Sequence, residues 1–166
     1  MKILIEQEPS GGFGFRDSAT WHQQAATASA ASSRQESMHA LFVCICRHLQ
    51  SKGIIRSVDL LAKELLAREV SGSTVIADHL ANPHAQGPFV DECVLFYLRL
   101  FRPVPQWDGS HDVSRLLLTL IPQNPSMKDL QYLRGLYRRM GGDEVLDLLG
   151  TGSITDVRQI LTTEGK

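Results

Sequence analysis

The chain is poor in cysteine, has no excess of charge of either sign and contains no long apolar run. Its three cysteines are an odd number, and no second Cys or His pair lies at zinc-binding spacing from Cys44 and Cys46. We therefore expect buried, reduced cysteines in a cytoplasmic protein. The formal net charge of −1 provides no basic field for nucleic acid. No segment reaches the roughly 18 apolar residues that would cross a membrane, and the N-terminus lacks the apolar core of a secretory signal.

What is present is typical of one globular domain, with 43% hydrophobic and 21% charged residues in a chain of 166, enough for a substantial core. Residues 1–36 differ from the rest. Alternation over 1–5 predicts a strand, 9–14 predicts a loop, and the Ala, Ser and Thr of 25–33 fit either a helical extension or a linker. We therefore divide the chain into an N-terminal extension of unassigned role, 1–36, and a main domain, 37–166.

Apolar periodicity in the main domain predicts helices that alternate with buried strands. Helices are expected from Met38 to about Gly53, after the N-cap Ser57, and after Ser126 and Ser153, each of which has an aspartate three residues later. Continuous apolar runs predict buried strands over 92–101, ended by Pro103 and Pro105, and over 115–121. This alternation predicts the α/β class, with a small mixed sheet flanked by helices.

Three short segments carry chemistry: Arg68-Glu69, Gly72-Ser73-Thr74 and Ala81-x-Pro83-His84-Ala85. Imidazole is often neutral at pH 7 and is then a nucleophile, and a guanidinium binds phosphate oxygens bidentately. A histidine on a proline turn near an arginine therefore suits phosphoryl transfer. Each residue also has a simpler interpretation. His84 could be an ordinary surface residue in a turn, and Arg68 could be a solvated cation that stabilises the C-terminus of a helix through its dipole.

Together these segments resemble the signature of the mannitol/fructose-type IIA component of the bacterial phosphoenolpyruvate-dependent sugar phosphotransferase system. The family pattern reads roughly R-E, a short gap, and G-S-T-G-I-x-N-G-I-A-I-P-H-A, and the resemblance covers about residues 36–162. It implies a small mixed sheet flanked by helices and a cytoplasmic phosphocarrier that uses no cofactor. The histidine of P-H accepts a phosphoryl group from the carrier protein HPr and passes it to the IIB component of a sugar permease. His84 is then the expected phosphoacceptor, and Arg68 the residue that stabilises its charge.

Several residues are expected to support this chemistry. One imidazole nitrogen attacks phosphorus while the other is held by a hydrogen bond, for which Asn82, Asp78 and a backbone carbonyl are all candidates. Thr74 either supports the histidine loop or caps local structure. Docking of partners is expected on an exposed apolar patch around His84, with Ala81, Ala85 and Phe89 as candidate members.

The sequence departs from the family pattern in two ways. Many members carry a second histidine at the start of the helix after the long buried strand, where this chain has Ser126, a residue that also fits an N-cap. Val75 and His79 replace two usual glycines, so the loop is expected to differ in shape. We consider the hypothesis that His79 replaces the missing imidazole. His79 and His84 lack a third ligand, so no metal site is expected.

These departures leave two alternatives to a transport role. The chain could be a regulatory interaction module whose phosphorylation state, or surface alone, controls a transporter, kinase or transcription factor. It could also be a relative that has lost phosphotransfer. If the chain has the transport role, its expected partners are HPr and a IIB protein or domain, with no nucleic acid and no membrane insertion.

Overall fold

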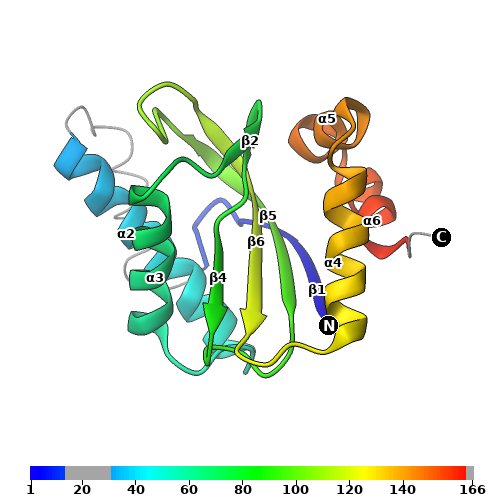
Figure 1. The fold of residues 1–166 in the computed structure, drawn as a ribbon. Coiled ribbons are helices and arrows are strands. Elements are labelled where there is room, and N and C mark those ends of the chain that lie inside the picture. The colour runs from blue at the N-terminus through cyan, green and yellow to red at the C-terminus, as the bar shows by residue number, and fades with distance from the viewer. Residues whose placement is uncertain (14–30, 164–166) are drawn as a thin grey trace.

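A computed structural model describes residues 1–13 and 31–163 of the protein. One mixed sheet separates two layers of helices, with α2 and α3 on one face and α4, α5 and α6 on the other (Figure 1). The helices are α2 (Ala31–Ser51), α3 (Val58–Val70), α4 (Met127–Arg139), α5 (Asp143–Thr151) and α6 (Ile154–Thr162). The strands are β1 (Lys2–Gln7), β2 (Val75–Ala77), β3 (His79–Ala81), β4 (His84–Gly87), β5 (Val94–Val104) and β6 (Val113–Pro122). The predicted α/β class with a mixed, helix-flanked sheet is confirmed.

Two long strands, β5 and β6, form the antiparallel centre of the sheet. The strand order is β1-β5-β6-β3-β2, with β1 parallel to β5 and β2 antiparallel to β3. Both β3 and β4 run parallel to β6, one after the other along the same edge: Ala81 pairs with Leu116, and His84 with Thr119. The segment that contains Pro83 and His84 is thereby aligned against the central strand.

The continuous apolar runs of β5 and β6 arise because each strand is buried on both faces. Phe96, Leu98 and Leu118 belong to a core shared with α2 and α3. Leu95 and Leu117 point to the opposite face, into a core shared with α4, α5 and α6. The sheet thus divides the molecule into two hydrophobic cores.

The predicted helix starts agree with the structure. The side chains of Ser57, Ser126 and Ser153 each accept a hydrogen bond from the backbone N–H three residues on, and Ser153 forms a full capping box. The expected end of the first long strand at Pro103 is wrong, because β5 runs to Val104. The pairing of β5 with β6 is irregular between Arg99 and Val104, and such an irregularity accommodates a proline that has no N–H to donate.

The N-terminal region is part of the same architecture wherever it is described. β1 pairs with β5 over its whole length, and the proposed boundary at residue 36 falls inside α2. Residues 25–30, for which a helical extension or a linker was expected, lie outside the described residues, and the chain is helical from Ala31. All three cysteines are buried and free, and burial raises the pKa of Cys46 to about 12.

A buried polar cluster attaches α5 to the central strands. Arg115 is 6% exposed and donates to the Tyr97 hydroxyl at 2.8 Å and to the Gly152 carbonyl at 2.6 Å. The Tyr97 hydroxyl in turn donates to the Leu149 carbonyl at 2.6 Å. Burial raises the pKa of Tyr97 although Arg115 acts in the opposite direction, so the hydroxyl keeps its proton. The last turn of α5 is thereby held against the sheet.

Tyr97→Phe is expected to lower the free energy of unfolding by about 1–3 kcal/mol, because it leaves a buried carbonyl and a buried guanidinium each short of a partner. Urea unfolding of the variant and the wild type measures the difference. An unchanged midpoint and slope would show that the cluster contributes no net stability.

Candidate functional site

His84 begins β4, directly after Pro83, and its side chain is exposed. Along β4 the residues alternate between exposed and buried, with Ala85 and Gly87 facing the interior. This is the period-two alternation of a strand. The fold therefore presents the imidazole on a hydrogen-bonded strand that pairs with β6, rather than on a free loop.

The hydrogen bonds of the His84 ring define its tautomer. Nδ1 lies 3.0 Å from the backbone oxygen of Asn82. A carbonyl oxygen can only accept, so Nδ1 carries the proton and Nε2 presents its lone pair. Arg68 Nε donates to Nε2 at 3.0 Å. Of the three candidates for holding the ring, the structure selects a backbone carbonyl.

Arg68 reaches the imidazole from the last turn of α3. Its Nη1 donates to the Gly72 carbonyl at 2.8 Å, which fixes the guanidinium while Nε faces His84. The expected pairing of Arg68 with His84 is therefore present in the geometry. The next residue, Glu69, is buried and turns to the other side of the loop.

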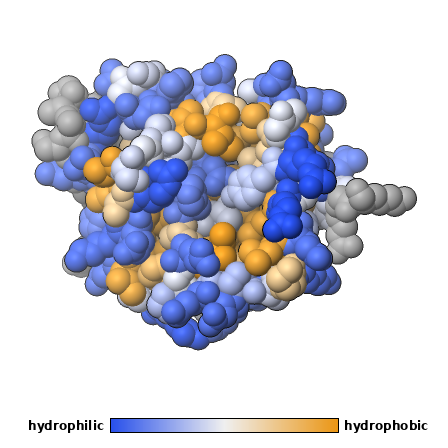
Figure 2. Space-filling view, viewed as in Figure 1, coloured by the Kyte–Doolittle hydropathy of each residue, from blue (hydrophilic) through white to orange (hydrophobic). Residues whose placement is uncertain are grey.

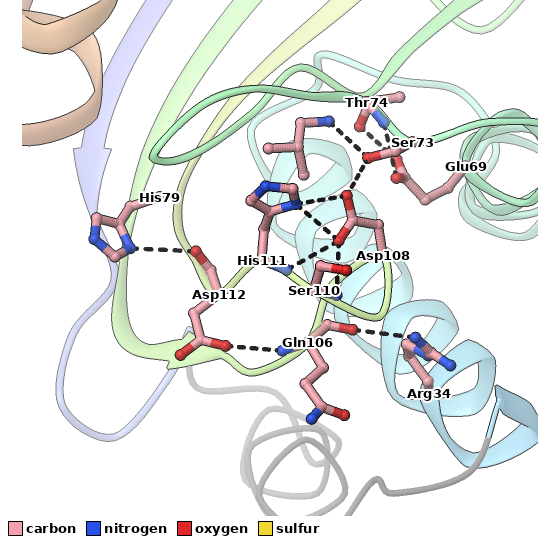
Figure 3. Close-up of polar contacts among 11 residues, drawn as sticks. Arg34, Glu69, Ser73, Thr74, His79, Gln106, Asp108, Ser110, His111 and Asp112 are labelled. Atoms are coloured by element: carbon pink, nitrogen blue, oxygen red, sulfur yellow. Dashed lines mark hydrogen bonds and ion pairs between the residues drawn. The ribbon is translucent and has the colours of Figure 1, made fainter.

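The loop between α3 and β2 is held by a buried carboxylate (Figure 3). Glu69 accepts from the Thr74 N–H at 2.9 Å and also from the Thr74 hydroxyl. The Thr74 carbonyl accepts from the Asn82 N–H at 2.8 Å. The Thr74 hydroxyl is thus bound to Glu69, and Thr74 contacts the histidine segment through its carbonyl.

A second polar cluster fixes the same loop from the β5–β6 turn, as Figure 3 shows. The Ser73 hydroxyl donates to Asp108 at 2.8 Å. Asp108 also accepts from the backbone N–H groups of Ser110 and His111 and lies 2.9 Å from His111 Nδ1. Burial disfavours the charged carboxylate, but these hydrogen bonds outweigh it and hold the pKa of Asp108 well below its usual range.

His84 opens onto a shallow pocket of about 370 Å³ between α3 and α4. Its lining includes Arg68, Ile76, Asn82, Thr119 and Tyr137. Figure 2 shows one face of the molecule, where hydrophobic patches lie above and below a more hydrophilic centre.

The expected docking patch needs correction. Ala81, Ala85 and Phe89 are 0%, 9% and 5% exposed and belong to the core. Ile76 and Tyr137 are 37% and 40% exposed and line the pocket instead. The exposed apolar surface beside His84 thus comes from β2 and α4.

The structure does not bring Asp78 or His79 to His84. His79 pairs with Val113 and His84 with Thr119, six residues further along β6, or about 20 Å at the rise of a strand. The His79 Nδ1 atom lies 3.3 Å from the Asp112 carbonyl. This register gives no support to the hypothesis that His79 replaces a second imidazole. The backbone of His79 has φ 64°, a conformation that suits the glycine of the family pattern.

Asp78 lies at the turn between β2 and β3, where its backbone approaches α5. A side chain at Gly150 would meet the Asp78 carbonyl at 2.8 Å, so only glycine allows this contact. Ser126 is likewise separate from the pocket. Its hydroxyl accepts from the Asp129 N–H at 3.1 Å, beyond the end of the pairing between β4 and β6 at Pro122. Ser126 is the N-cap of α4 and is not among the described residues that line the His84 pocket.

Sequence reasoning missed Thr119 and Tyr137, which lie in the pocket. The hydroxyls of these two residues are 3.0 Å apart, and the Asn82 side-chain amide donates to the Tyr137 oxygen at 3.3 Å. The only sequence signal for Thr119 is a polar residue within a buried apolar run. Tyr137 occupies a position in α4 that periodicity assigns to the core.

Residues 1–13 and 31–163 contain no group of three His, Cys, Asp or Glu side chains that could hold a metal ion. Over the same residues, no helix is both long and apolar enough to cross a membrane.

The fold and the pocket define a small α/β domain that presents a histidine beside an arginine. The chain belongs to the family described as "Phosphoenolpyruvate-dependent sugar phosphotransferase system, EIIA 2", whose model matches residues 28–164. The resemblance found in the sequence is thereby confirmed. Over 117 residues the chain is 32% identical to the PTS system 2-O-alpha-mannosyl-D-glycerate-specific EIIABC component of Escherichia coli K12. This match covers 68% of the chain but only 17% of that relative.

Solved structures share the fold at lower identity. IIA-Ntr, a nitrogen regulatory protein from Neisseria meningitidis, matches with a TM-score of 0.53 and 24% identity, over 96% of this chain and 92% of that one. IIA mannitol from Escherichia coli matches with a TM-score of 0.52 and 16% identity, over 78% and 89%. The same enzyme in complex with phosphorylated IIBMTL matches with a TM-score of 0.51 and 16% identity, over 76% and 85%.

The depressed pKa of Asp108 predicts a pH dependence of stability. The unfolded aspartate has a pKa of about 3.9, and the pKa of the folded one is lower. The stabilisation is therefore complete above the unfolded pKa and is lost as the pH falls toward the folded value. At pH 6, Asp108→Asn is expected to unfold more easily than wild type by about 1–3 kcal/mol, because hydrogen bonds to a charged group are lost.

Denaturant unfolding of both proteins between pH 6 and pH 3 measures this difference, which is expected to shrink as the pH falls. A gap that stays constant over the whole range would contradict the assignment.

Proposed function

We propose that this protein is a phosphocarrier of the sugar phosphotransferase system, in which His84 Nε2 accepts a phosphoryl group from phospho-HPr and passes it to a IIB component. Membership of the EIIA family supports a phosphotransfer role in general. The observation that carries the specific proposal is the hydrogen bond from His84 Nδ1 to the Asn82 carbonyl, because it leaves Nε2 as the nucleophile.

The transfer follows from that tautomer. The Nε2 lone pair attacks phosphorus as the bond between phosphorus and the donor's imidazole nitrogen breaks. The proton on His84 Nδ1 stays in place, and the positive charge that develops on the ring is stabilised by the Asn82 carbonyl oxygen. Since phosphoryl transfer depends mainly on positioning and charge neutralisation, a fixed imidazole beside a cation supplies both requirements.

Arg68 has one role before the transfer and another after it. Before transfer, its Nε–H faces the Nε2 lone pair at 3.0 Å, and the attacking nitrogen must exchange this hydrogen bond for the bond to phosphorus. Afterwards the guanidinium can donate to phosphoryl oxygens, for which its planar fork is well suited. Its anchor on the Gly72 carbonyl keeps it at the site throughout.

The partners are proposed from the family and from the surface of the pocket. The relative in Escherichia coli is titled an EIIABC component, and one solved neighbour is a complex of IIAMTL with phosphorylated IIBMTL. We propose by analogy that a IIB protein or domain docks over the exposed side chains of Ile76 and Tyr137 in the cytoplasm. The donor, HPr, must reach the same histidine and would use the same surface.

A regulatory role is the second candidate. Among the described residues that line the pocket, His84 is the sole histidine, so the paired imidazoles found in many transport-type members are absent here. One neighbour in fold is titled a nitrogen regulatory protein. In this case the phosphorylation state of His84, or the surface around it, would control a partner protein instead of feeding a permease.

Incubation with phosphoenolpyruvate, enzyme I and HPr is expected to phosphorylate the wild type and His79→Ala but not His84→Ala. Intact mass under alkaline conditions, which preserve phosphohistidine, measures the gain of one phosphoryl group. His79→Ala is the matched control because it removes an exposed imidazole about 20 Å away. Phosphate on His84→Ala, or none on the folded wild type beside a competent control IIA, would contradict the proposal.

Arg68→Ala is expected to slow transfer from phospho-HPr by about ten- to a hundredfold, the loss typical of a charged hydrogen bond. Arg68→Lys should recover only part of the rate, since lysine keeps the charge but lacks the fork. Rapid-quench measurement of phosphoprotein formation gives both rates. Arg134→Ala, which removes an exposed cation from α4, is the control, and an equal loss there would indicate a general effect of surface charge.

A further inference from the structure

Tyr137 is the centre of a small hydrogen-bond network in the His84 pocket. The Thr119 hydroxyl lies 3.0 Å from the Tyr137 hydroxyl, and the Asn82 Nδ2 donates to the Tyr137 oxygen at 3.3 Å. Thr119 and Asn82 are 1% and 5% exposed, whereas Tyr137 is 40% exposed. Two buried polar groups therefore converge on one hydroxyl that reaches the pocket surface.

The direction of these hydrogen bonds leaves a proton available. A tyrosine hydroxyl has one proton to donate and lone pairs to accept. The Asn82 amide already donates to the oxygen, and Thr119 can do the same. The Tyr137 hydroxyl can also donate to Asn82 Oδ1, but this hydrogen bond is long, at 3.4 Å, and therefore weak. When Thr119 donates, the Tyr137 proton has no short acceptor among these residues and is free for a ligand.

Among its described residues, the pocket offers a phosphoryl group a single cation. A phosphoryl group on His84 Nε2 presents three oxygens. The described lining residues include one cationic side chain, Arg68, and no histidine besides His84. Ser126 and His79, which the sequence offered as further donors, lie elsewhere. Tyr137 is an exposed neutral donor that lines the same pocket as His84 and Arg68. The Ser73 hydroxyl also lines this pocket but already donates to Asp108.

We propose that the Tyr137 hydroxyl donates a hydrogen bond to a phosphoryl oxygen on His84, with Thr119 and Asn82 as positioning residues that orient this hydroxyl. The change requires only rotation of the two hydroxyl hydrogens, Thr119 to Tyr137 and Tyr137 to the phosphoryl oxygen. No proton is transferred, and no bond forms or breaks beyond the transfer already described. The proposal rests on the phosphocarrier function and assigns this chain its own substitute for a second imidazole.

The test compares two tyrosines of the same helix. Tyr137→Phe keeps the ring that docks a partner and removes the hydroxyl. Tyr132→Phe makes the same change five residues earlier, where the hydroxyl donates to the Leu161 carbonyl and does not line the pocket. Transfer from phospho-HPr is expected to fall about ten- to a hundredfold in Tyr137→Phe, as a lost hydrogen bond to a charged group predicts, and to be unchanged in Tyr132→Phe. The loss should be in the maximal rate and not in the HPr concentration at half-saturation.

A second pair of variants tests the orienting role of Thr119. Thr119→Val removes the buried hydroxyl and should slow transfer, whereas Thr119→Ser keeps the hydroxyl and should restore most of the rate. The phosphorus NMR shift of phosphohistidine provides a readout that folding alone does not move. It is expected to change in Tyr137→Phe and to stay at the wild-type value in Tyr132→Phe.

The outcomes separate this proposal from the one on which it rests. A wild type that HPr cannot phosphorylate, with a competent control IIA in parallel, would overturn the phosphocarrier function and the role of Tyr137 with it. A wild type that is phosphorylated, with Tyr137→Phe equal to it in rate and in phosphorus shift, would overturn the role of Tyr137 alone.

Discussion

One hydrogen bond, from His84 Nδ1 to the backbone carbonyl of Asn82, determines what the site can do. It places the ring proton on one nitrogen and the lone pair on the other. Because the acceptor belongs to the main chain, rotation of the Asn82 side chain does not remove it. The residue between the two partners is Pro83, whose ring restricts the backbone. The tautomer of the imidazole is thus determined by a backbone carbonyl at Nδ1, in agreement with the Arg68 donor at Nε2.

The rest of the structure maintains that geometry. The Asn82 N–H is held by the Thr74 carbonyl, and Thr74 is held in turn by the buried Glu69. On the strand side, the Pro83 carbonyl accepts from the Thr119 N–H at 3.0 Å. α3 therefore contributes twice within one turn, with Arg68 directed to the imidazole and Glu69 to the loop. The β5–β6 turn adds a third support through Ser73 and Asp108.

The sequence predicted those features that depend on local pattern. Apolar periodicity and serine caps located the helices, and the family signature pointed to His84 and Arg68, which the structure places 3.0 Å apart. It could not locate residues whose position depends on strand register. Asp78 and His79 are near His84 in sequence. Because β3 and β4 pair with successive parts of β6, these residues nevertheless lie far from His84 along that strand. Tyr137 is far in sequence and reaches the pocket only because α4 packs beside β6.

The position of His84 on a paired strand has an energetic consequence. β4 is bonded to β6 from its first residue, and this pairing would hold the backbone in one conformation if His84 gains and loses the proposed phosphoryl group. Little of the free energy of a phosphorus–nitrogen bond would then be used to reshape the protein. Most of its transfer potential would remain available to the next acceptor, which keeps a relay of this kind close to reversible.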